Sequence, residues 1–103
     1  MRYDAVFIKK GDMIYISHLD LMTAFRRAIR RGGLPFVLTA GFTPRVKLSM
    51  PRALKLGLES ERETMSFWLT EEMDPEEALR AINKELPEGI HIAEVVLGVN
   101  SKQ

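Results

Sequence analysis

The chain has 103 residues, of which 46% are apolar and 28% charged, with a formal net charge of +1 at pH 7. These values exclude an intrinsically disordered protein and predict a single domain over residues 1–98, followed by a disordered tail over residues 99–103. Because the chain contains no cysteine, it has no thiolate metal ligands, iron–sulfur ligands or cysteine nucleophiles, and we expect no cofactor in this chain.

The N-terminal third predicts a strand followed by a helix. Residues Arg2–Lys9 are β-rich and end at a turn around Gly11. Ser17 can then cap a helix over His18–Arg31, with Asp20 reaching back as in a capping box. Gly32 and Gly33 stop this helix, because glycine adopts the left-handed conformation beyond a helix end without a steric penalty.

The helical period divides this first helix into an apolar face and a basic face. The apolar face carries His18, Leu21, Met22, Phe25, Ala28 and Ile29, and the opposite side carries Arg26, Arg27, Arg30 and Arg31.

The middle of the chain predicts extended structure. We expect a second strand over Leu34–Thr39, a turn over Ala40–Pro44 and an extended segment with a basic edge over Val46–Met50. The alternating leucines of Leu54–Leu58 and the strand-like run Thr64–Thr70 predict a hairpin.

The last third predicts a helix and a final strand. Asp74 and Pro75 are typical of an N-cap and a first helical position, and Pro87–Gly89 ends the helix before a strand over Ile90–Leu97. The buried stripe of this helix comprises Ala78, Leu79, Ile82 and Leu86. The element order predicts an α+β, ferredoxin-like β-α-β-β-α-β sandwich, with two helices on one face of an antiparallel sheet and an extra hairpin segment.

Charge is divided unevenly between the two halves of the chain. Residues 1–58 hold eleven Lys/Arg and three Asp/Glu, a net charge of +8, whereas residues 59–103 hold four and eleven, a net charge of −7. This asymmetry indicates either a surface for a polyanion or the pairing of opposite faces within or between molecules. The candidate nucleic-acid-binding residues are Arg26, Arg27, Arg30, Arg31, Arg45, Lys47, Arg52 and Lys55.

Trp68 is a second candidate for binding. If Met65, Phe67 and Leu69 face the helices, strand alternation places Trp68 on the other face of the sheet. An aromatic side chain there favours packing on a partner, such as a second copy of the chain, and also resembles the base-stacking faces of some RNA-binding domains.

His18 is the weak candidate for a catalytic residue, as the general acid or base of a small metal-independent ribonuclease. Ser17, His18 and Asp20 do not form a catalytic triad, because side chains so spaced at a helix start diverge; helix capping explains them better. The two histidines, His18 and His91, and the scattered carboxylates lack metal-ligand spacing, so we predict no metal site.

Several motifs resemble the radical-SAM-linked protein family, a bacterial domain of unknown function. The resemblance rests on Ser17–Met22, on Arg27–Arg31, on Gly41-Phe42-Thr43-Pro44 and on Leu56–Ser60, so the family-motif residues are Ser17, His18, Asp20, Gly41, Phe42, Pro44 and Gly57. Thr43 and Arg45 depart from the Asn and His that the family usually has. The family domain extends further toward the C-terminus, so the chain is expected to match its N-terminal portion. The resemblance implies a radical SAM protein as partner, acting on RNA or the translation apparatus.

Three functions remain open from the sequence. The first is an accessory domain that binds RNA, or presents an RNA or ribosomal substrate, through a basic face. The second is a docking or self-associating module without nucleic acid, with a homo-oligomer forming through the Trp68 face. The third is the ribonuclease. The absence of an apolar run of about 20 residues and the charged N-terminus predict a cytoplasmic protein with no membrane contact.

Overall fold

The strand β1 (Arg2–Lys9) forms the centre of the fold. Its side chains alternate between full and partial burial, with Tyr3, Ala5, Phe7 and Lys9 on the buried face. In the computed structural model, which describes residues 1–50 and 60–98, β1 pairs antiparallel with β3 (Ser60–Trp68) on one side and β4 (Ile90–Leu97) on the other. The short strand β2 (Leu48–Ser49) extends the sheet beyond β3, which gives the order β2-β3-β1-β4.

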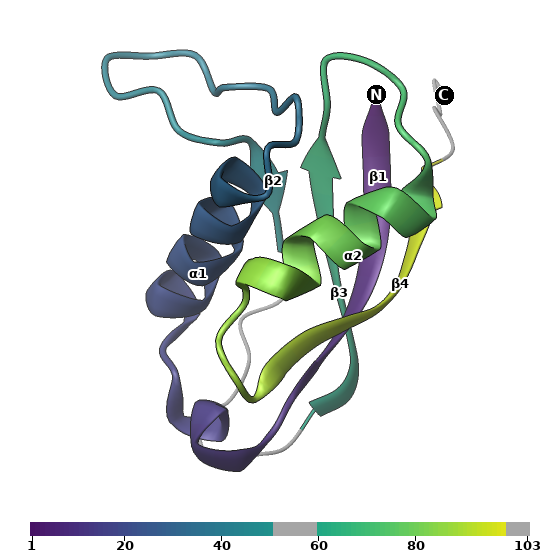
Figure 1. Ribbon diagram of the computed structural model, residues 1–103. Coiled ribbons are helices and arrows are strands. Elements are labelled where there is room, and N and C mark those ends of the chain that lie inside the picture. The colour runs from purple at the N-terminus through teal and green to yellow at the C-terminus, as the bar shows by residue number, and fades with distance from the viewer. Residues whose placement is uncertain (51–59, 99–103) are drawn as a thin grey trace.

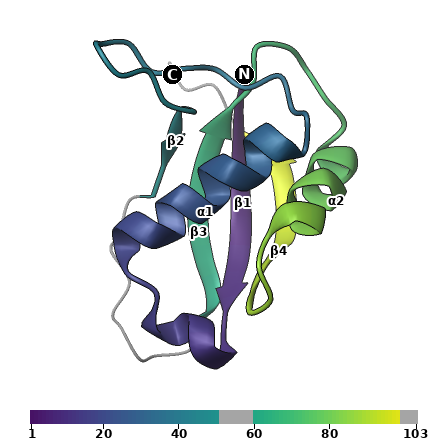
Figure 2. The same cartoon turned by 60° about the vertical axis from the view of Figure 1, so that its left-hand side comes forward.

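Two helices cover one face of this sheet (Figures 1 and 2). They are α1 (His18–Arg31) and α2 (Pro75–Glu85), and a short 3-10 helix, η1 (Gly11–Tyr15), precedes α1. This arrangement confirms the predicted α+β fold with two helices and a four-stranded antiparallel sheet, consistent with a ferredoxin-like topology. The 3-10 helix is not anticipated from the sequence, where only a turn is expected. No helix in the described part of the chain is long and apolar enough to cross a membrane.

The core lies between the sheet and the helices. Phe25 of α1 meets Phe7 of β1 edge to face, with ring centroids 5.0 Å apart, and Tyr3 stacks on Phe67 across β1 and β3 at 5.4 Å. Ala78 and Ile82 of α2 are buried, and Leu79 and Leu86 pack beside them, as the predicted stripe requires.

Both helix starts are capped as predicted. Ser17 Oγ accepts a hydrogen bond from Asp20 N at 3.1 Å, and Asp74 Oδ1 accepts one from Glu76 N at 3.3 Å. In the second half of the predicted capping box the Ser17 amide would donate to the Asp20 carboxylate, and this bond is not among the hydrogen bonds of the described residues.

The geometry at the end of α1 explains why Gly32 and Gly33 occur there. Gly33 has a φ of +78°, and the amides of Gly33 and Leu34 donate to the carbonyls of Arg30 and Ile29 at 3.2 and 3.4 Å. This is a Schellman motif. A Cβ at Gly32 would lie 3.0 Å from the carbonyl oxygen of Ala81, so α2 also passes close to this glycine.

The predicted strand Leu34–Thr39 is wrong. This segment makes only isolated bridges, Phe36 with Leu69 and Leu38 with Val46. Pro35 has no N–H to donate, which prevents a continuous ladder at its start. The predicted extended segment Val46–Met50 contains β2, which is only two residues long.

The third strand also differs from its prediction. It begins at Ser60 instead of Thr64, because β1 pairs with it as far as Lys9 opposite Ser60. The other half of the predicted hairpin, Leu54–Leu58, and the predicted tail over residues 99–103 lie outside the described residues.

Two side-chain anchors, from the buried Tyr3 and the half-buried Asn83, fix the α2 side of the domain. The Tyr3 hydroxyl donates to Met73 O at 3.0 Å and accepts from Met73 N at 2.7 Å, which ties β1 to the loop before α2. The Asn83 side chain bonds both the amide and the carbonyl of Ile92 at 2.7 and 2.8 Å. Because β4 is an edge strand, Asn83 satisfies backbone groups there that no neighbouring strand pairs.

We therefore expect Tyr3→Phe to destabilise the fold by about 1–2 kcal/mol, since it leaves both backbone groups of Met73 without the hydroxyl. Tyr15→Phe is the matched control, because Tyr15 is 67% exposed and its hydroxyl makes no hydrogen bond in the described structure. Urea unfolding followed by fluorescence of the single Trp68 measures both variants. Equal stability of the two would show that the Met73 contact contributes nothing.

Candidate nucleic-acid interface

The chain between α1 and β2 forms a projecting arm. We define the arm as residues 36–47; Figure 1 shows this part extending beyond the body of the domain. Its two sides are joined by hydrogen bonds from Thr39 N to Arg45 O at 2.7 Å and from Lys47 N to Val37 O at 2.7 Å. Val37 N also donates to Trp68 O at 3.0 Å, so the arm is continuous with the end of β3.

The tip of the arm is held closed by a side chain. Thr39 Oγ1 accepts a hydrogen bond from Arg45 N at 3.0 Å, so Thr39 and Arg45 are linked twice. Gly41 within the tip has a φ of +120°, which a residue with a Cβ rarely adopts. Phe42 and Pro44, which belong to the family motif, are exposed on this tip.

The arginines of α1 lie beside the base of the arm. Arg27, Arg30 and Arg31 are exposed, as the helical period predicts. Arg30 places its guanidinium 5.0 Å from the ring centroid of Phe36, at the start of the arm. We call Arg26, Arg27, Arg30, Arg31 and Arg45 the basic surface.

Arg26 connects the helix to the arm directly. Its Nε donates to Val46 O at 3.3 Å, and Arg26 is half-buried as a result. Burial and, second, repulsion from Arg45 lower the pKa of the Arg26 guanidinium below its usual range. Because Val46 directly follows Arg45 in the chain, the hydrogen bond to Val46 O brings Arg26 beside the backbone of Arg45.

Carboxylates do not neutralise the basic surface in the part of the chain that the structure describes. An ion pair joins Arg2 and Asp4 at 3.2 Å, and no carboxylate of the described residues pairs with an arginine of the basic surface. Within the described residues, the arginines of the basic surface therefore have no ion-pair partner.

Lys47 does not belong to the basic surface. Strand alternation turns it to the open face of the sheet, where its ammonium lies 4.7 Å from the ring centroid of Trp68. This position confirms that Trp68 lies on the face opposite Met65, Phe67 and Leu69, which are buried. Arg52, Lys55 and Gly57 lie outside the described residues.

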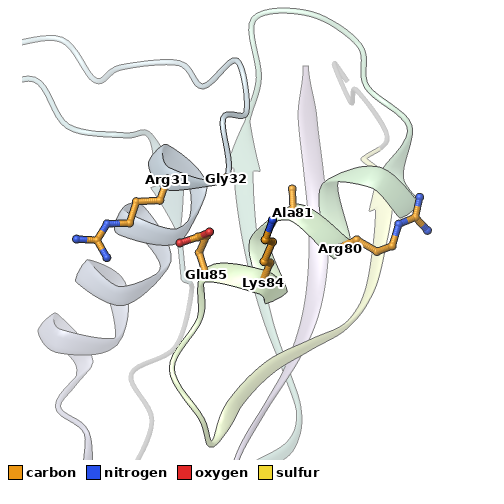
Figure 3. Close-up of a pocket in the computed structure, with 6 residues that line it drawn as sticks. All are labelled: Arg31, Gly32, Arg80, Ala81, Lys84 and Glu85. Atoms are coloured by element: carbon orange, nitrogen blue, oxygen red, sulfur yellow. The ribbon is translucent and has the colours of Figure 1, made fainter.

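A hollow between α1 and α2 borders the basic surface at Arg31. It has a volume of about 290 Å³ and is lined by Arg31, Gly32, Arg80, Ala81, Lys84 and Glu85. Figure 3 shows the side chains of Arg31 and Arg80 pointing in opposite directions, away from the hollow. The cations of the hollow therefore do not converge on one ligand. Arg80 and Lys84 were missed by the sequence analysis, although their i, i+4 spacing places them on one helix face.

His18 lies at the first position of α1 and is half-buried. Its Nδ1 is inaccessible to solvent and has no hydrogen-bond partner among the residues that the structure describes. His91 is exposed on β4, on the sheet face that the helices leave open, so it does not assist His18. In residues 1–50 and 60–98, no three His, Cys, Asp or Glu side chains gather as metal ligands.

Comparison with known proteins identifies the family of the chain. A family model described as "Uncharacterized protein conserved in bacteria (DUF2344)" matches residues 2–103, so the chain belongs to this family. No curated protein matches the chain.

We expect Thr39→Val to loosen the arm without destabilising the domain. The variant loses the Oγ1 acceptor of Arg45 N, so hydrogen exchange of the Arg45 amide should accelerate up to about tenfold. Thr43→Val is the matched control, because Thr43 is exposed at the tip and makes no hydrogen bond in the described structure. Amide exchange followed by NMR measures both. Unchanged exchange at Arg45 in Thr39→Val would mean that this contact does not hold the tip.

Proposed function

We propose that this member of the DUF2344 family binds RNA through the basic surface, as an accessory domain of a radical SAM protein. The observation that carries the proposal is the set of five arginines on α1 and the arm, none of which is neutralised by a carboxylate in the described structure. Guanidinium groups bind phosphate oxygens well because their N–H groups form a planar fork.

The electrostatics of Arg26 and Arg45 support phosphate binding. Arg26 is positioned by its hydrogen bond to Val46 O, in the residue after Arg45, and repulsion from Arg45 contributes to the lowered pKa of Arg26. A phosphate group beside both guanidinium groups would relieve this repulsion. The arrangement therefore favours a polyanion over a neutral ligand.

The radical SAM partner is supported by the motif resemblance of Ser17–Met22 and Gly41–Pro44. In the fold, the first motif supplies the start of α1 and the second forms the tip of the arm, so the two motifs frame the basic surface. Because the chain has no cysteine, an iron–sulfur cluster would belong to the partner. On this proposal, the domain holds the RNA and the partner carries out the chemistry.

Self-association is a second candidate function, favoured by the open face of the sheet. The helices leave this face uncovered, and it carries the apolar side chains of Val6, Ile8, Trp68 and Val96 beside the Ser66–Asp4 hydrogen bond of 2.7 Å. Val96 is 45% exposed. A second copy of the chain that covers this face would remove apolar surface from water.

The RNA proposal is tested by replacing Arg27, Arg30 and Arg31 together with alanine. Each lost phosphate contact lowers the slope of log affinity against log salt by about 0.7 for single-stranded RNA, so the slope should fall by about 2. Fluorescence anisotropy with labelled RNA at several salt concentrations measures this slope.

The matched control removes three exposed cations elsewhere, with Lys10→Ala, Arg80→Ala and Lys84→Ala combined. It has the same net charge as the first variant and should keep most of the slope. Equal losses in both variants would refute a specific role for the basic surface. Absence of RNA binding by the parent protein at low salt would eliminate the proposed function.

Self-association is tested separately by light scattering over a range of concentrations. On this second proposal the mean mass rises with concentration, and Val96→Lys reduces the rise because a charge would be buried between copies. Thr23→Lys adds the same charge on the exposed side of α1 and should leave the rise unchanged. A constant monomer mass would rule out self-association.

A further inference from the structure

Phe42 is the most exposed large apolar side chain in the described part of the molecule. Its relative exposure is 107%, so the folded domain contributes no contact that shields the ring. Such exposure is unfavourable for an aromatic side chain in water, because the ring has no contact to compensate for its hydration.

The ring is presented by an ordered support. The double link between Thr39 and Arg45 closes the tip directly behind Phe42, and Gly41 supplies the turn conformation before it. Lys47 N and Val37 O add a further link toward the body of the domain. Because these contacts already order the backbone of the tip, binding of a ligand to the ring costs little further backbone entropy.

The charge around the ring selects the kind of ligand. No acidic residue occurs between Leu21 and Leu58, and Arg45 follows the tip within three residues of Phe42. A ligand that suits this environment combines negative charge with flat apolar faces. Unpaired nucleotides have both, because each joins a phosphate to a base with an open π face. In a duplex, stacking hides these faces.

We propose that Phe42 stacks on an unpaired base and makes the domain selective for single-stranded over double-stranded RNA. The inference rests on the proposed function, since the arginines of the basic surface hold the phosphates of the same strand. One exposed ring with a basic neighbour is insufficient for stable membrane anchoring, which requires more buried apolar area.

Phe42→Ala and Phe42→Trp test the stacking role. Binding is measured with a labelled single-stranded oligouridine RNA and with a blunt RNA duplex of equal length. Phe42→Ala should weaken binding of the single strand about tenfold and leave binding of the duplex unchanged, whereas Phe42→Trp should restore the parent affinity. The salt slope should stay at its parent value in both variants, since no charge is lost.

Tyr15→Ala is the matched control, because Tyr15 is an exposed aromatic residue of η1, outside α1 and the arm, and is 67% accessible. It should leave the affinity for both RNAs unchanged. Because Phe42 lies outside the core, its replacement should not alter the fold, and circular dichroism should report the parent spectrum for each variant.

Three outcomes would overturn the inference. The first is RNA binding by the parent protein with no effect of Phe42→Ala, which would leave the proposed function standing and remove only the stacking role. The second is an equal loss on the single strand and the duplex. The third is Phe42-dependent binding to vesicles of phosphatidylcholine with phosphatidylserine, without dependence on Phe42 for RNA. Failure of the parent protein to bind either RNA would contradict the proposed function itself.

Discussion

The packing of α1 against the sheet determines where its charges can lie. Phe25 contacts Phe7 edge to face, and Leu21, Ala28 and Ile29 are buried on the same side of the helix. With one face of a 3.6-residue period fixed against the sheet, the arginines at the remaining positions must point outward or sideways. Arg27, Arg30 and Arg31 are exposed for this reason, and Arg26 reaches sideways to Val46.

The arm depends on the same packing. The Schellman motif at the end of α1 reverses the chain and leads it into the arm, whose base contacts the helix through Arg26 and Arg30. Its other contact is with the end of β3, through Val37 and Trp68. The arm thus contacts both α1 and the end of β3. The basic surface and the exposed Phe42 therefore belong to one structural unit.

Local signals made much of the fold predictable. The strand Arg2–Lys9, the helix starting after Ser17 and the strand Ile90–Leu97 are confirmed with the predicted bounds, because alternation, caps and glycine stops act within a few residues. The predicted strand Leu34–Thr39 is wrong, because strand formation depends on which distant segment pairs with it. Local composition does not reveal that partner, and the segment makes only isolated bridges. The position of Lys47 beside Trp68 follows from alternation with the buried Val46. The exposure of Phe42 does not follow from any period, because a loop tip has none.

The central claim is that α1 and the arm together form the RNA-binding surface. NMR titration of the labelled protein with a single-stranded RNA tests it most directly, since each amide reports its own position. We predict shift changes at Arg26–Arg31 of α1 and at residues 40–45 of the arm, with β4 unchanged. Changes confined to the open sheet face around Trp68 and Val96, or none at all, would contradict it.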